Sequence, residues 1–124
     1  MAKRILIVED QDFARRGIAA ILEQDGHTAM HAKNALEAQA LCTENPPDVA
    51  IVDIELPGLK GNEWALHLQE TNPQTRIIFV SGRPSLPGLD RFGTDVHFLR
   101  KPFSPDMLLE LVEEGQCIQM LNSE

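Results

Sequence analysis

The sequence predicts an α/β domain with a five-stranded parallel sheet and helices on both of its faces. Two observations predict this class. Short apolar runs alternate with longer segments of helical periodicity along the chain, and such alternation with short joins implies right-handed crossovers and parallel strands. Four of the apolar runs also end at or just before a polar residue, as expected where strand ends meet at a ligand-binding edge.

The first third of the chain is expected to hold a buried strand, a helix and an edge strand. Arg4–Val8 is apolar without alternation, as in a strand that is buried on both faces. Asp12 is expected to cap a helix over residues 12–25, which Gly26 ends. Residues 27–31 are mixed in polarity and are expected to form an edge strand.

The middle of the chain is expected to hold two helices and the central strands. Ala35–Glu44 has helical periodicity and is followed by an Asn-Pro-Pro segment that ends the helix. Val49–Asp53 and residues 76–80 are apolar runs typical of central strands. Between them, Asn62 is expected to cap a helix that directs Trp64 inward.

The last strand and helix follow a segment that breaks the pattern. Residues 83–96 contain two prolines and two glycines, so the fourth helix should be shortened or missing. Residues 96–99 are expected to form a short final strand. Ser104 should cap a final helix that has Pro105 at its first position and runs to about residue 121.

Length and composition exclude several classes of protein. The chain has 124 residues, of which 43% are hydrophobic, and this suits one folded domain. No apolar run approaches the ~20 residues of a membrane span, so membrane insertion is not expected. The formal net charge of −8 argues against direct nucleic-acid binding. Cys42 and Cys117 lack metal or redox spacing, which favours a reduced, cytoplasmic protein.

Five polar side chains are expected to gather where the strands end. Three are acids, one is a hydroxyl and one is an ammonium, a set that suits a divalent metal beside a phosphate acceptor. Taken singly, each has an ordinary explanation as a solvated strand end, a helix cap, a turn former or a surface charge. The five residues are Glu9, Asp10, Asp53, Ser81 and Lys101.

Four segments carry a resemblance to a known family. They read ILIVED, DVAIVDIELPGLKGNE, RIIFVSG and FLRKPF, in that order along the chain. With these segments the sequence resembles, over its whole length, the receiver domain of bacterial two-component response regulators. The resemblance implies a flavodoxin-like, doubly wound sheet with the strand order 2-1-3-4-5, and one receiver (phosphoacceptor) domain over residues 1–124.

The resemblance assigns four residues to a magnesium site. Asp10 should be a direct ligand of Mg²⁺, and Glu9 should act mainly through water. Asp53 should be both a ligand and the phosphoryl acceptor, which makes the chain an aspartyl phosphoprotein. The backbone carbonyl of Glu55 should complete the protein's share of the site. All of these are oxygen ligands, which Mg²⁺ prefers.

Three further residues are assigned to phosphorylation and to switching. The Lys101 ammonium and the Ser81 hydroxyl should stabilise the charge on the transferred phosphoryl group. Ser81 and Phe98 should form the switch, since Phe98 stands three residues before Lys101, where the family has an aromatic switch residue. The protein would be a phosphoacceptor switch rather than an enzyme, with at most slow Mg²⁺-dependent self-dephosphorylation.

The predicted function is a stand-alone switch in two-component signal transduction. The expected partners are a histidine kinase or phosphotransfer protein and an unknown downstream protein target, and a homodimer is compatible with the sequence. The alternative is a phosphorylation-independent interaction module with the same fold. An aspartate-nucleophile phosphatase and a flavin-binding protein fit less well, because the chain lacks a substrate cap and a phosphate loop after the first strand. The sequence leaves open whether an effector domain follows.

Other polar residues are expected to be structural. His27 and His31 stand four residues apart on a strand, about 13 Å at ~3.3 Å per residue, so they cannot share a metal ion. His67 should be exposed on its helix. Arg15 and Arg16 should lie on a solvated helix face, and a role in partner contact is the less favoured alternative.

Overall fold

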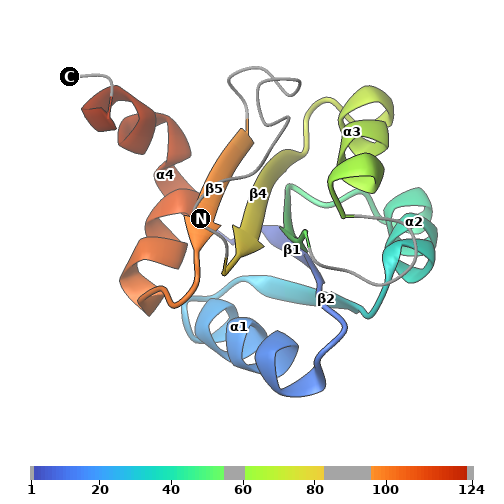
Figure 1. Cartoon of the computed structure of the whole chain (residues 1–124), viewed down its shortest axis with the longest axis horizontal. Coiled ribbons are helices and arrows are strands. Elements are labelled where there is room, and N and C mark those ends of the chain that lie inside the picture. Colours follow the sequence, from blue (N-terminus) through green and yellow to red (C-terminus); the bar gives the residue numbers. More distant parts are fainter. Residues whose placement is uncertain (1, 55–60, 83–95, 123–124) are drawn as a thin grey trace.

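The computed structural model describes residues 2–54, 61–82 and 96–122. These ranges contain five strands and four helices (Figure 1). The expected loss of the fourth helix falls on residues 83–95, and Glu55 falls on residues 55–60, so both predictions lie outside the described residues. In chain order the elements are β1 (Arg4–Val8), α1 (Asp12–Gln24), β2 (Thr28–Ala32), α2 (Ala35–Glu44), β3 (Val49–Asp53), α3 (Gly61–Thr71), β4 (Arg76–Ser81), β5 (Val96–Arg100) and α4 (Pro105–Asn122).

The strands form one parallel sheet in the order β2-β1-β3-β4-β5. α1 and α4 cover one face of the sheet, and α2 and α3 cover the other (Figure 1). The chain moves outward from β1 to β2 and then returns past β1 to β3. Ligands bind outside the carboxyl ends of the strands at such a reversal. The predicted flavodoxin-like, doubly wound class and its strand order are confirmed.

Each face of the sheet has its own apolar layer. Successive residues of a strand point to opposite faces, so Leu6 and Val8 pack beneath α2 and α3, whereas Ile5 and Ile7 pack beneath α1 and α4. All four side chains are fully buried, and each such side chain stabilises the fold by roughly 2 kcal/mol. These runs lack alternation because both of their faces are covered.

Local side chains set several helix ends. Gly26 follows α1 with a φ of 90°, a conformation that favours glycine. Ser104 Oγ accepts a hydrogen bond from the Met107 N–H at 3.2 Å at the start of α4. Gly26 and Ser104 therefore act as predicted. At α2, the Asn34 side chain accepts a hydrogen bond from the Glu37 N–H at 2.8 Å, a cap that was not predicted from the sequence.

The predicted cap of α1 is wrong. Gln11 is the N-cap residue and makes no side-chain capping bond, and Asp12 is the first helical residue. The Asp12 carboxylate instead accepts a hydrogen bond from Arg15 Nη2 at 2.6 Å. A carboxylate bonds more strongly to a charged donor than to a neutral one, so the guanidinium one turn away takes the place of the backbone N–H.

Other element boundaries differ from the prediction by one or two residues. β2 begins at Thr28, because the His27 N–H donates to the Leu22 carbonyl at 3.0 Å and so belongs to the end of α1. α3 begins at Gly61, which places Asn62 inside the helix rather than at its cap. Among the described residues, no helix is both long and apolar enough to cross a lipid bilayer.

Candidate functional site

The carboxyl edge of the sheet, where the parallel strands end, brings three acidic residues together. Glu9 and Asp10 follow β1, and Asp53 is the last residue of the neighbouring strand β3. One carboxylate oxygen from each lies within 4.8 Å of the other two. Glu9 and Asp53 are buried, whereas Asp10 is exposed. We refer to these three residues as the acid pocket.

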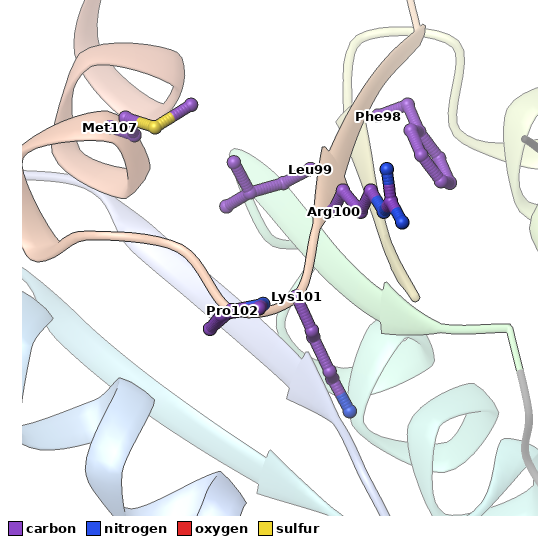
Figure 2. A pocket seen from close by; sticks show the side chains of 6 residues that line it. All are labelled: Phe98, Leu99, Arg100, Lys101, Pro102 and Met107. Carbon is purple, nitrogen blue, oxygen red and sulfur yellow. The ribbon is translucent and has the colours of Figure 1, made fainter. Parts of the chain in front are cut away.

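Lys101 joins the acid pocket from the end of β5. Its Nζ lies 3.4 Å from Glu9 Oε1 and 3.4 Å from Asp53 Oδ2. Its backbone N–H donates to the Ser81 carbonyl at 2.7 Å, which holds Lys101 beside the end of β4. Figure 2 shows the Lys101 side chain pointing away from Leu99 and Met107. The ammonium therefore lies between the two buried acids.

The acid pocket shifts the pKa of two of the groups that meet there. Burial, a hydrogen bond with Asp53 and the Asp53 charge raise the pKa of Glu9 to about 7, although the Gln11 N–H and the Lys101 ammonium act in the opposite sense. Burial alone would lower the pKa of Lys101, but the charges of Asp53 and Glu9 outweigh burial and raise that pKa. Crowded carboxylate oxygens of this kind fit a hard divalent cation such as Mg²⁺.

The structure places Ser81 at the same edge and Phe98 on the adjoining strand. Ser81 is the last residue of β4 and is fully buried. Phe98 lies opposite Phe79 of β4 and is half-buried on the side of α2 and α3. Figure 2 shows Phe98 and Leu99 on opposite sides of β5. The five polar residues thus gather as the sequence predicts, and the switching roles of Ser81 and Phe98 stay predictions.

The prediction for Arg15 is wrong, because the residue is buried rather than solvated. Only 5% of Arg15 is exposed. Its guanidinium donates to the Glu9 carbonyl at 3.0 Å and to the Asp12 carboxylate at 2.6 Å. Arg16 is exposed, as predicted. The spacing of Asp12 and Arg15 is a signal that could have indicated this contact, since opposite charges three residues apart meet on a helix.

An apolar groove beside the acid pocket was not foreseen from the sequence. It has a volume of about 680 Å³ and lies between α1 and the segment that follows β5. Glu9 and Lys101 line the groove at the acid pocket, and Phe13, Ile21 and Phe103 supply apolar surface. Phe13 is 93% exposed. Exposed apolar surface of this kind is typical of a protein contact site.

A second group of potential metal ligands lies at the amino edge of the sheet, where the strands begin. Asp25, His27 and Glu113 have ligand atoms within 4.8 Å of one another. His27 Nε2 is 3.5 Å from Asp25 Oδ2 and 3.4 Å from Glu113 Oε2. His27 Nδ1 accepts a hydrogen bond from the Lys3 N–H at 3.1 Å. We refer to Asp25, His27 and Glu113 as the amino-edge cluster.

Comparison with known proteins matches the chain to one family. The family model of the response regulator receiver domain matches residues 5–113. The response regulator receiver protein CpdR of Brucella abortus is 33% identical over 115 residues, which cover 90% of this chain and 92% of CpdR. The sensor kinase CckA of Brucella abortus is 33% identical over 118 residues, or 89% of this chain and 12% of CckA. YkoG of Bacillus subtilis, a transcriptional regulatory protein, is 34% identical over 109 residues, or 85% of this chain and 47% of YkoG.

The matched structures agree with the sequence comparison. A CheY-like receiver domain protein from Methanospirillum hungatei superposes with a TM-score of 0.85 at 30% identity, covering 98% of this chain and 99% of that one. The fold and the carboxyl-edge site therefore define a receiver domain of the CheY-like class. The chain belongs to the response regulator receiver domain family of two-component systems. Members of this family are phosphoacceptor switches that interact with histidine kinases and downstream effectors.

Proposed function

We propose that this protein is a Mg²⁺-dependent receiver that accepts a phosphoryl group on Asp53 from a histidine kinase or a phosphotransfer protein, and that residues 1–124 act as one phosphoacceptor domain. The position of Lys101 carries the proposal, because its Nζ lies 3.4 Å from both Asp53 and Glu9. A lysine between two buried acids is a point charge that can pass from a carboxylate to a phosphoryl oxygen on Asp53.

Glu9, Asp10 and Asp53 would hold the metal ion, with the Glu55 carbonyl as the expected fourth protein ligand. The close approach of the three carboxylates supports this assignment, as do the burial and the Asp53 contact that raise the pKa of Glu9 to about 7, because a cation stabilises the ionised carboxylates. When bound, Mg²⁺ would neutralise charge on the phosphoryl oxygens during transfer.

The chain's own residues support a direct phosphoryl transfer. An Asp53 carboxylate oxygen attacks phosphorus, and an oxygen–phosphorus bond forms while the phosphorus–nitrogen bond of the donor's phosphohistidine breaks. The electron pair of that bond leaves on the imidazole nitrogen, which takes up a proton. Lys101 stabilises the negative charge on the phosphoryl oxygens, and the Ser81 hydroxyl is the proposed donor to one of them. Slow hydrolysis of the acyl phosphate would return the switch to its resting state.

The groove beside the acid pocket supports a protein as the phosphoryl donor. It places Phe13 and Phe103 next to Glu9 and Lys101, so a helix that packs on the groove would bring its histidine toward Asp53. The net charge of −8 also favours a protein partner over nucleic acid. This groove gives the phosphorylation-independent interaction module its only structural support among the described residues.

Output would then depend on Ser81 and Phe98. A phosphoryl group on Asp53 would draw the Ser81 hydroxyl at the end of β4, and the half-buried Phe98 on the neighbouring strand would turn inward. A downstream protein, or a second copy of this chain, would bind the altered surface of β5 and α4.

The test is uptake of phosphoryl from acetyl phosphate in the presence of Mg²⁺, followed by intact mass. The wild-type protein should gain one phosphoryl group that hydroxylamine removes, whereas Asp53→Asn should gain none, because an amide is not a nucleophile of this kind. Asp106→Asn, an exposed aspartate on α4, is the matched control and should be phosphorylated normally.

Two results would contradict the proposal. The first is phosphorylation of Asp53→Asn, and the second is equal phosphorylation in excess EDTA. A wild-type protein that binds Mg²⁺ but takes up no phosphoryl group from acetyl phosphate or from a phosphohistidine protein would favour the interaction module instead.

A further inference from the structure

Arg15 joins three elements of the fold behind the acid pocket. Its Nη1 donates to the Glu9 carbonyl at 3.0 Å. Its Nη2 donates to Asp12 at 2.6 Å, and its Nε donates to His31 Nδ1 at 3.3 Å. These partners belong to the end of β1, the first turn of α1 and β2. Because a guanidinium presents its donors in one rigid plane, this one side chain fixes the three elements relative to one another.

The bond to the Glu9 carbonyl is the one that reaches the acid pocket. The Glu9 N–H already donates to the Ala32 carbonyl at 3.0 Å, so the amide side of Glu9 is held by β2. The Glu9 carbonyl belongs to the peptide group that leads into Asp10. Since a peptide group is planar, holding this carbonyl also sets the direction in which Asp10 leaves the strand. The contact with Arg15 is buried, so the bond is shielded from water.

We infer that Arg15 is a positioning residue for the metal site, because it fixes the turn from which Glu9 and Asp10 reach the ion. This inference rests on the proposed function, since it concerns the same ion and the same acids. Arg15 contacts the backbone of one expected ligand and is not itself a ligand. Partners that orient metal ligands in this way typically change metal affinity by about 10–100-fold.

Arg15 also carries a charge, and the two roles predict effects of opposite sign. The guanidinium contacts the backbone of Glu9, and a positive charge near a metal site opposes the binding of a cation. If only its charge mattered, removing Arg15 would strengthen Mg²⁺ binding. If Arg15 positions the turn, removing it weakens Mg²⁺ binding in spite of the lost repulsion. The sign of the change therefore distinguishes the two roles.

The experiment compares Arg15→Gln with Arg16→Gln, which removes the same charge from the exposed neighbouring residue. Calorimetric titration with Mg²⁺ should show roughly tenfold weaker binding for Arg15→Gln, and a change of less than about twofold for Arg16→Gln. Arg15→Lys keeps the charge but lacks the planar fork, so its loss should be intermediate.

A kinetic readout separates positioning from a general loss of structure. With acetyl phosphate as donor, Arg15→Gln should need a higher Mg²⁺ concentration for half-maximal phosphorylation, and saturating Mg²⁺ should restore a rate close to that of the wild type. A variant that is merely destabilised would lose rate at every Mg²⁺ concentration. That result would count against positioning.

Unchanged or tighter Mg²⁺ binding by Arg15→Gln, or an equal loss in Arg16→Gln, would overturn the inference. If circular dichroism shows that Arg15→Gln does not fold, Arg15→Lys decides. Weaker Mg²⁺ binding at an unchanged Tm supports positioning, and unchanged binding contradicts it. If the wild-type protein does not bind Mg²⁺, the proposed function is overturned as well. If the wild-type protein and the Arg15 variants bind Mg²⁺ equally well, only the inference about Arg15 is overturned.

Discussion

The acid pocket and the amino-edge cluster lie at opposite edges of one sheet and have the same density of potential metal ligands. In each, three residues have ligand atoms within 4.8 Å of one another. The acid pocket places the like-charged Glu9 and Asp53 in the interior, with Lys101 Nζ 3.4 Å from each. The amino-edge cluster places a histidine in the interior and leaves Asp25 exposed and Glu113 half-buried. Proximity of ligand atoms therefore does not by itself define a metal site.

The two groups differ in the hydrogen-bond partners and charges that surround the buried side chain, which is His27 in the amino-edge cluster and Glu9 in the acid pocket. His27 Nδ1 accepts a hydrogen bond from the Lys3 N–H, so in the neutral ring Nε2 carries the proton and faces the two carboxylates as a donor. No lone pair is then left on Nε2 for a metal ion. In the acid pocket, burial and the contact with Asp53 raise the pKa of Glu9 to about 7, so ionisation of Glu9 is disfavoured there. A cation would relieve the acid pocket and would disrupt the amino-edge cluster.

Removing one acid from each group tests most directly whether the acid pocket binds Mg²⁺ and the amino-edge cluster does not. Asp10→Ala should weaken Mg²⁺ binding by about a hundredfold, or about 2.7 kcal/mol, because the change removes a proposed direct ligand. The same change should raise the stability of the metal-free protein by about 1 kcal/mol, since repulsion among the carboxylates falls. Calorimetry with Mg²⁺ and urea unfolding in EDTA measure the two effects.

The matched control for Asp10→Ala is Asp25→Ala, which removes an exposed acid from the amino-edge cluster. It should leave Mg²⁺ affinity within about twofold of the wild type, because it touches no ligand of the proposed site. A comparable loss of Mg²⁺ affinity in both variants would show that the amino-edge cluster takes part in Mg²⁺ binding as much as the acid pocket does.

The pH dependence of stability should also separate the two groups. An unfolded glutamate titrates near pH 4.5, whereas the pKa of Glu9 is raised to about 7 by burial and by Asp53. Between these values the folded metal-free protein holds more protons than the unfolded chain, so its stability falls as pH rises. We expect Glu9→Gln to remove about 1–2 kcal/mol of this fall, measured by urea unfolding in EDTA from pH 4.5 to 8.

Glu113→Gln is the counterpart at the amino edge. A hydrogen bond from Asp25 lowers the pKa of Glu113, so its contribution to stability is present at neutral pH and is lost as pH falls. The variant should therefore keep the fall in stability between pH 5 and 7. If Glu113→Gln removed that fall and Glu9→Gln did not, the assignment of the strained carboxylate to the acid pocket would be wrong.

The sequence predicted the acid pocket because its members stand at strand ends. The apolar runs of β1, β3 and β4 are buried on both faces. The first polar residue after each run therefore marks the end of the buried strand. Parallel pairing of the strands then brings Asp10, Asp53 and Ser81 to one edge of the sheet, independently of the conformation of the connecting loops. The fold and five of the site residues were predictable from this rule and from the family resemblance.

Arg15 and His27 were not predictable in the same way. Each lies in a polar stretch that favours a solvated position, and each is buried by the packing of separate elements. Arg15 meets a backbone carbonyl of β1, and His27 meets the Lys3 N–H and a residue of α4. Backbone partners leave no trace in the side-chain pattern, and the contact with α4 spans 86 positions along the chain.

The smallest expected effect concerns His27 itself. His27→Ala should lower the free energy of unfolding by about 1–2 kcal/mol, because it removes a buried ring with its hydrogen bonds to the Lys3 N–H and to the Glu113 carboxylate. It should leave Mg²⁺ affinity unchanged, since the amino-edge cluster is a structural contact between α1, β2 and α4.

His67→Ala is the matched control, because His67 is exposed on α3, and it should change stability by less than about 0.5 kcal/mol. Urea unfolding and Mg²⁺ or Zn²⁺ titration test both variants. If His27→Ala removed a divalent-ion site present in the wild type, the amino-edge cluster would be a metal site after all, and the hydrogen bond from Lys3 would not protect it.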